Sequence, residues 1–219
     1  GDQRADGQFP VNMCNNGRLT KCREESSVFG TTFVLHGLWH AQHHGWRDPV
    51  APIAGRALDF LLKNQEPDAR GWWRYWTRSD PYHQTLPPDL DDTACARAVL
   101  LQYGNQYDTP FEDDPAAILA FERPDGWFPT WTADAVALNG RPILYSRLGP
   151  DCAVNVNVLY YLARHGIVKA HLCRRIEKAV RAQHFPQCSY YYQDALLFAY
   201  LVSRAFAEGP LPCLRPALD

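Results

Sequence analysis

A histidine inside an apolar run is the first residue whose type and surroundings suggest chemistry. The segment Thr31 to His40 reads TTFVLHGLWH, and His36 follows a β-favouring run of Phe, Val and Leu. Imidazole titrates near neutral pH, so His36 is a candidate for proton transfer at the end of a short strand. The structural alternative is a half-buried histidine on a core strand, which is the commoner case for a lone histidine among apolar residues. Both alternatives predict a β-strand over residues 33–39.

The residues before this segment favour the catalytic alternative. FPVNMCNNGRLTKC, residues 9–22, holds an aromatic-Pro pair and two cysteines separated by a short polar loop. With the F-V-L-H-G-L-W segment that follows, this pattern resembles the first catalytic cassette of the ribonuclease T2 family, although His40 stands where the family has Pro. The resemblance implies one α+β domain over residues 1–219, in which several helices pack on a central, mostly antiparallel sheet.

The resemblance also implies a reaction. Enzymes of this family cleave single-stranded RNA through a 2′,3′-cyclic phosphate and use no metal or other cofactor. The chemistry needs one group that takes the proton of the 2′-hydroxyl, another that protonates the departing 5′-oxygen, and positive charge beside the phosphorus. The family supplies two histidines and a lysine, of which one histidine matches His36. The rest come from a second cassette, F-W-x-H-E-W-x-K-H-G.

That second cassette is degraded in this chain. The segment GWWRYWTRSD, residues 71–80, keeps the spacing of the two tryptophans. The four positions that carry the chemistry in the family match, in order, Arg74, Tyr75, Arg78 and Ser79. A serine hydroxyl titrates far above neutral pH and cannot replace a histidine as acid or base. The sequence therefore predicts a pseudo-ribonuclease that is inactive or strongly impaired.

Side chains around the degraded cassette predict that the protein still binds RNA or nucleotides although it has lost the catalytic groups. Trp39, Trp72 and Trp76 flank it and could stack on unpaired bases. Arginine binds phosphate but is a very poor proton donor. We expect weak, salt-sensitive binding of a mononucleotide or sulfate near His36, lost on Arg78→Ala. The partner is then RNA or a nucleotide, or a protein in an extracellular assembly to which this chain contributes structure.

Two displaced histidines leave an active endoribonuclease open as the alternative. His83 lies just behind the degraded cassette, and YYLARHG, residues 160–166, matches the second cassette with Arg164 for the lysine and His165 for the second histidine. The collinear match on residues 71–80 keeps the family's order and spacing. After it, TWTADAVALNGRPILYS resembles the helix and the Pro-containing strand that follow the cassette.

A cluster of histidines follows His36. HAQHHGW contains His40, His43 and His44, at spacings that a transition metal could use on a helix. The segment has no cysteine or acidic residue beside it and is expected to run from a strand into a loop. We therefore expect a solvated histidine-rich loop and no bound metal.

Composition limits the setting of the protein. The net charge of −2 argues against a general polyanion binder, although a nuclease with a small cleft needs no basic face. No apolar stretch approaches the about 18 residues of a membrane span. Seven cysteines and a start at Gly1 predict an exported chain whose signal peptide has been removed.

The family resemblance also suggests how the cysteines pair. It implies a bridge between Cys14 and Cys22 and two further bridges near the C-terminus, whose connectivity the sequence leaves open. The four cysteines of those bridges are Cys152, Cys173, Cys188 and Cys213. Cys95 is then left over, and we expect it to be a free, buried thiol.

Periodicity predicts several helices. Helical patterns cover residues 56–64, 94–103, 115–121, 169–183 and 194–206. The second of these begins near Asp91 or Asp92, which are suitable residues for a helix start. Residues 154–161 alternate loosely and begin with β-branched side chains, so a strand is possible there.

Overall fold

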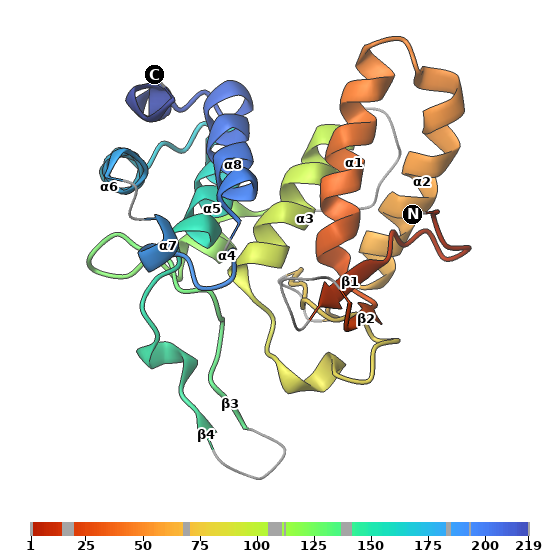
Figure 1. Ribbon diagram of the computed structural model, residues 1–219, viewed down its shortest axis with the longest axis horizontal. Helices are drawn as coiled ribbons and strands as arrows, with labels where there is room; N and C mark the ends of the chain where they lie inside the picture. The colour runs from red at the N-terminus through yellow and green to blue at the C-terminus, as the bar shows by residue number, and fades with distance from the viewer. Residues whose placement is uncertain are drawn as a thin grey trace.

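The computed structural model is mostly helical, and each of two pairs of short strands is followed along the chain by a group of helices (Figure 1). It describes residues 2–14, 20–67, 71–104, 111, 113–136, 142–182, 185–192 and 194–218. The elements are β1 Val11–Cys14, β2 Cys22–Glu25, α1 Val28–His43, α2 Arg47–Lys63, α3 Leu90–Tyr103, α4 Pro115–Leu119, β3 Ala135–Val136, β4 Pro142–Ile143, α5 Cys152–Arg164, α6 Ala170–Arg181, α7 Phe185–Cys188 and α8 Ala195–Glu208.

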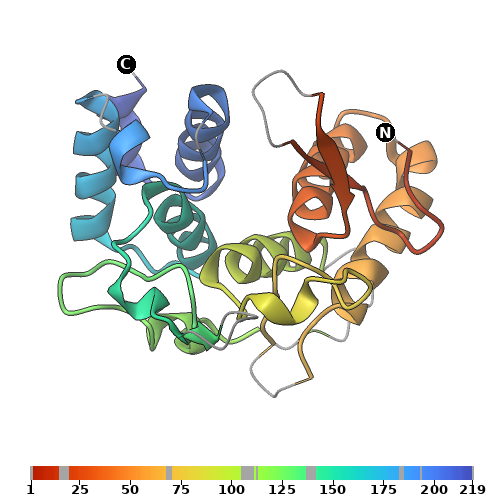
Figure 2. The ribbon, with the colours of Figure 1, turned by 60° about the horizontal axis from the view of Figure 1, so that its bottom comes forward.

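Helix α3 lies in the middle of the molecule. Helices α1 and α2 lie on one side of it, and α5, α6 and α8 lie on the other, as Figure 2 also shows. Ala96 and Val99 of α3 join the apolar cluster formed with α1 and α2, whereas Ala94 and Ala98 join the cluster formed with α5 and α8. Almost every residue of α3 is buried, so its small and apolar residues pack on both sides and its buried polar residues need partners inside the protein.

Helix α5 replaces the possible strand at residues 154–161, so that prediction is wrong. The Asp151 carboxylate caps the helix by accepting from the backbone N–H groups of Ala153 and Val154, at 2.7 and 3.1 Å. Every residue from Cys152 to Ala163 is buried. Because all sides of α5 are buried, its sequence lacks the one-sided periodicity that identifies a surface helix.

The predicted strand over residues 33–39 is also wrong, because these residues lie within α1. Ser27 begins this helix by accepting from the Phe29 N–H at 3.1 Å. Strand propensity is a weak preference that packing overrides, and α1 packs along both α2 and α3. The helix also contains His40 and His43, so the predicted histidine-rich loop is not formed there.

The expected central sheet is absent from the part of the chain that the structure describes. That part holds two small antiparallel hairpins, β1–β2 and β3–β4. Strand β3 lies where a helix was expected after the degraded cassette, whereas β4 lies in the segment where the Pro-containing strand was expected. The predicted mixture of helices and strands is confirmed, but the protein is mostly helical.

The helices predicted from periodicity are confirmed in α2, α3, α4, α6 and α8. Three disulfides are present, and they join Cys14 to Cys22, Cys152 to Cys188, and Cys173 to Cys213. Cys95 is a buried free thiol, as predicted. Three disulfides fit a protein of an oxidising compartment. Among the described residues, none of the helices has the length and apolar character needed to cross a membrane.

Candidate active site

The residues predicted to bind phosphate do not share contacts with His36. His36 accepts or donates hydrogen bonds with Tyr200 and Glu208, at 2.7 and 2.9 Å. Arg74 pairs with the Glu66 carboxylate at 3.2 Å and donates to a backbone carbonyl. Arg78 donates to the backbone oxygen of Gln65 at 2.6 Å. Both arginines therefore already have partners elsewhere.

The other residues of the degraded cassette have structural partners. The Ser79 hydroxyl hydrogen-bonds to the hydroxyls of Ser26 and Thr77, each at 3.0 Å. Tyr75 is largely buried, and burial, reinforced by the Glu25 carboxylate, raises its pKa. Trp72 is buried in the core at 3 % exposure, so it presents no face to a base.

The displaced histidines also pair away from His36. The Nδ1 atom of His83 lies 2.8 Å from the backbone oxygen of Trp76. The Nε2 atom of His165 lies 2.7 Å from the Asp113 carboxylate. Trp39 packs against His43, with ring centroids 4.0 Å apart.

A different set of residues forms the site with the strongest chemical character. Three carboxyl groups, Asp89, Asp91 and Asp92, lie at the N-terminal end of α3 and are 2, 8 and 3 % exposed. We call them the acid trio. They line a cavity of about 520 Å³, which is within the usual range of about 300–1,000 Å³ for small-molecule sites. We call this cavity the acid pocket.

Asp89 and Asp92 are held together by the start of the helix. Asp89 is the N-cap residue of α3, and its Oδ1 accepts from the Asp92 N–H at 2.7 Å. Burial raises the pKa of Asp89 to about 7, although a side-chain hydrogen bond from Asp92 offsets part of the rise. Burial and the neighbouring Asp89 charge raise the pKa of Asp92 well above its usual range. The pair therefore keeps a proton at neutral pH.

Asp91 has a different environment within the same trio. Its Oδ1 accepts from the Asn157 amide at 2.7 Å, and its Oδ2 accepts from the Tyr192 hydroxyl. Asn157 in turn accepts from the Arg204 guanidinium at 2.6 Å. Burial raises the pKa of Asp91 to about 6, against the opposing effect of the Asn157 and Tyr192 hydrogen bonds. These bonds stabilise the carboxylate that remains after Asp91 gives up a proton.

One buried polar group without a partner points to a ligand in the acid pocket. The Trp76 indole N–H is buried and has no hydrogen-bond partner among the described residues, whereas the buried Asp89 Oδ2 and Asp92 Oδ1 can share the proton that this pair keeps. An unpaired buried polar atom costs about 1–3 kcal/mol. Trp76 lines the pocket, so a bound molecule with an acceptor atom could satisfy this N–H.

Aromatic side chains make up seven of the fifteen residues that line the pocket. They come from segments that meet around the start of α3, with α1 on one side and the α7–α8 connection on the other (Figure 1). These residues are Phe29, Tyr75, Trp76, Trp131, Tyr145, Tyr191 and Tyr192. Aromatic faces attract cations, and the attraction grows when water is excluded. The pocket therefore combines a proton donor with a wall that stabilises positive charge.

Comparison of the chain with protein-family models, with curated proteins and with solved structures found no match.

The acid trio was not identified as a site from the sequence, but a signal for it exists. Asp91 lies on the same helical stripe as Cys95 and Ala98, and Asp92 lies on that of Ala96 and Val99. A carboxylate on an apolar stripe is expected to be buried with it, and burial raises its pKa. Asp91 and Asp92 had been interpreted only as residues that start a helix.

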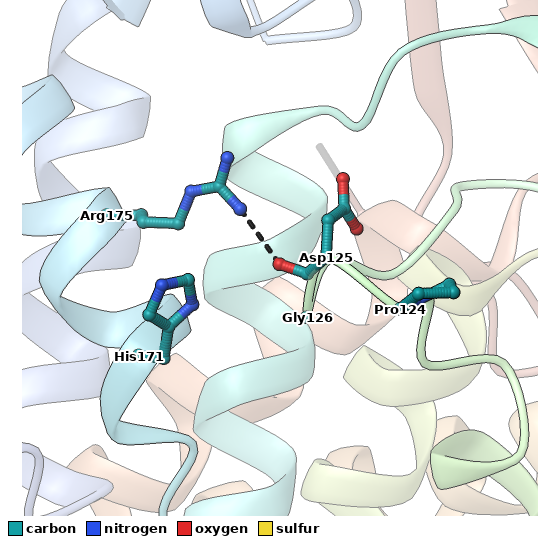
Figure 3. Close-up of a pocket in the computed structure, with 5 residues that line it drawn as sticks. All are labelled: Pro124, Asp125, Gly126, His171 and Arg175. Atoms are coloured by element: carbon teal, nitrogen blue, oxygen red, sulfur yellow. Dashed lines mark hydrogen bonds between the residues drawn. The ribbon is translucent and has the colours of Figure 1, made fainter.

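A second hollow lies between α6 and the loop that follows α4. Pro124, Asp125 and Gly126 line it on one side, and His171 and Arg175 on the other (Figure 3). Arg175 donates to the backbone oxygen of Asp125 at 2.9 Å and lies over the Trp127 ring. These contacts fix the loop against α6, and the structure gives this hollow no further chemistry.

Proposed function

We propose that this protein is an enzyme that protonates an apolar, unsaturated molecule in the acid pocket. The observation that carries the proposal is the buried acid trio in a cavity lined by aromatic side chains, in which the Asp89–Asp92 pair retains a proton at neutral pH and burial raises the pKa of Asp91 to about 6. Strongly perturbed pKa values in a cleft are characteristic of functional sites.

Asp91 is the proton donor in this proposal. It is the most exposed carboxyl group of the trio, and its pKa of about 6 still lies near neutral pH. Asp89, whose pKa is about 7, is less exposed and is engaged as the N-cap of α3. A general acid works best when its pKa is near the working pH. Asn157 and Tyr192 would hold the resulting carboxylate, and Asp92 would keep a second proton next to it.

The substrate class follows from the wall of the pocket. Transfer of the Asp91 proton to a carbon–carbon double bond breaks the O–H bond and forms a C–H bond, which leaves a carbocation. A branched, isoprenoid-like double bond suits this chemistry because it gives a tertiary cation. Aromatic faces such as Trp76 and Trp131 would stabilise the cation. Loss of a proton from another carbon would then return a proton to Asp91, so the net reaction is an isomerisation or a cyclisation.

A cation mimic tests the pocket without knowledge of the substrate. Protonated N,N-dimethyldodecylamine carries positive charge on an apolar chain, whereas dodecanol has the same chain without charge. Above pH 6, where Asp91 is ionised, we expect the amine to bind more tightly than dodecanol. Its binding should quench the tryptophan fluorescence of the pocket. Asp91→Asn should remove the preference, and the matched control Asp59→Asn, an exposed acid on α2, should keep it. Equal affinity for amine and alcohol in the wild type would contradict the proposal.

Ribonuclease activity stays a second candidate because His36 has a second histidine beside it. The ring centroids of His36 and His40 are 4.8 Å apart, close enough for both imidazoles to reach one phosphate. Cleavage of single-stranded RNA by wild-type protein, above the rate of His36→Ala, would support this candidate. The proposed setting in either case is the extracellular space, on the basis of the three disulfides.

A further inference from the structure

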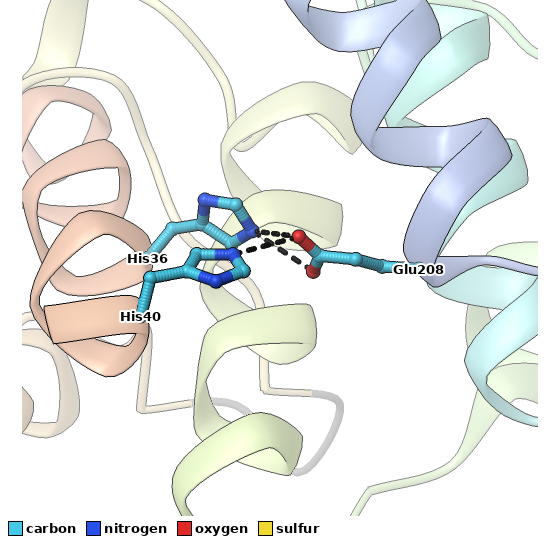
Figure 4. Close-up of side chains that lie close together, drawn as sticks. All are labelled: His36, His40 and Glu208. Atoms are coloured by element: carbon cyan, nitrogen blue, oxygen red, sulfur yellow. Dashed lines mark hydrogen bonds and ion pairs between the residues drawn. The ribbon is translucent and has the colours of Figure 1, made fainter. Parts of the chain in front are cut away.

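Two helices that are far apart in sequence place three metal-ligating side chains together. His36 and His40 lie one turn apart on α1, and Glu208 lies at the end of α8 (Figure 4). Figure 4 shows both imidazoles directed at the carboxylate across the space between the helices. The candidate ligand atoms of the three residues lie within 4.8 Å of one another.

We propose that His36, His40 and Glu208 form a zinc site that joins α1 to α8. Two histidines at positions i and i+4 of a helix, with a carboxylate from another element, are a frequent ligand set for zinc. The Nε2 atoms of His36 and His40 lie 2.9 and 2.8 Å from Glu208 oxygens. Ligand atoms around tetrahedral zinc are about 3.3 Å apart, so the His–Glu pairs must open slightly and the widest pair of ligand atoms, within 4.8 Å, must close.

Neighbouring hydroxyls already orient two of the three ligands. Tyr200 Oη lies 2.7 Å from Nδ1 of His36, so the ring presents Nε2 to Glu208. The Tyr160 hydroxyl donates to Glu208 Oε2 at 2.9 Å. Hydrogen bonds from outside the ligand shell that fix ring orientation are typical of metal sites.

The site is closed on one side and open on the other. The His36 side chain is 6 % exposed, whereas that of His40 is 42 % exposed. A cavity of about 640 Å³ adjoins the cluster and provides a path for the ion and space for a water molecule as fourth ligand. Arg204 also lines this cavity, but its guanidinium donates to Asn157 and lies over the Tyr160 ring.

Zinc and ribonuclease chemistry exclude each other at these histidines. A metal takes the Nε2 lone pairs of His36 and His40, so neither ring could then exchange a proton with RNA at that atom. The metal site is separate from the acid pocket, which has none of the three ligands in its lining. Failure of one proposal therefore leaves the other standing.

Titration with zinc alone tests the inference. Full-length protein is treated with EDTA, dialysed and titrated with Zn²⁺ in a calorimeter, and Co²⁺ is then used for its absorption spectrum. We expect one Zn²⁺ per chain, a tetrahedral Co²⁺ spectrum, and a melting temperature that rises with zinc concentration. Binding should release protons and weaken at low pH, because the imidazoles must be neutral to bind the metal.

Matched variants locate the ion. His40→Ala and Glu208→Gln should each weaken zinc binding by at least about 100-fold, because each leaves only two protein ligands. His43→Ala is the control, since this exposed histidine lies on the same helix and its Nδ1 faces the Trp39 carbonyl at 2.8 Å. It should bind zinc as the wild type does. The absence of stoichiometric binding by the wild type, or an equal loss in His43→Ala, would overturn the proposal.

Discussion

Replacing Asp91 by Asn should stabilise the protein at alkaline pH while it removes the proposed proton donor. The pKa of Asp91 is raised from 3.8 to about 6 by burial. A group whose pKa is higher in the folded state binds more protons there, so its contribution to stability falls as the pH rises. Asp91 therefore costs stability above pH 4, and the whole cost is reached above pH 6. Asparagine has no ionisation and does not carry this cost.

The magnitude follows from the shift. About two pKa units, at 1.36 kcal/mol each, correspond to about 3 kcal/mol at pH 8 and roughly half of that at pH 5. Asparagine can still accept from Asn157, but a hydrogen bond between Tyr192 and a charged carboxylate is lost, at a cost of about 1 kcal/mol. The variant should thus be about 2 kcal/mol more stable than wild type at pH 8 and close to wild type at pH 5.

Urea unfolding followed by tryptophan fluorescence, with the disulfides intact, measures this difference. Wild type, Asp91→Asn and the exposed control Asp59→Asn are compared at pH 5 and pH 8. The control should show little change at either pH. If Asp91→Asn is less stable than wild type at pH 8, or if its effect is the same at both values, Asp91 does not have a raised pKa and the reasoning fails.

Three further predictions concern the scaffold. Asp151→Ala should lower the free energy of unfolding by more than about 3 kcal/mol, because this fully buried carboxylate accepts hydrogen bonds from α5 and from the segment after α7. Scanning calorimetry measures the loss, and a loss below about 1 kcal/mol would contradict this role. Replacing Cys173 and Cys213 together by serine should cost about 4 kcal/mol, since their bridge closes a long loop with a sequence separation of 40; an unchanged melting temperature would argue against the bridge. Burial raises the pKa of the Cys95 thiol, so native protein at pH 8 should not react with a thiol reagent until it is unfolded; rapid reaction of the native protein would show that Cys95 is accessible.

Local signals in the sequence predicted elements that have one apolar face. In helix α6, apolar and basic residues recur at helical spacing, and only Leu172, Cys173 and Ile176 are buried. This periodicity was sufficient to predict the helix from the sequence. A strand is predicted within α1 from the β-favouring run Phe33 to Leu35, and a strand is possible within α5 from its β-branched start. In both, burial over a long apolar surface outweighs a propensity that spans only about 1 kcal/mol.

Sites made of distant residues could not be predicted from local spacing. The histidine cluster was considered as a metal site and set aside for lack of an acidic ligand, but Glu208 supplies one from 168 residues beyond His40. The acid trio is contiguous, but its chemistry depends on Asn157, Tyr192 and the aromatic wall, which only the packing of α3 against α5 brings to it.

The most direct test of the central claim is proton transfer from the acid trio to carbon. Wild-type protein and Asp91→Asn are incubated in D₂O with farnesol and with squalene, and the recovered material is analysed by mass spectrometry. The account predicts deuterium on carbon with wild type, a rate that increases as the pH falls through about 6, where Asp91 becomes protonated, and a loss of about 100- to 10,000-fold in Asp91→Asn. Deuterium incorporation that is equal in wild type and Asp91→Asn, or absent for wild type with every branched alkene tested, would contradict it.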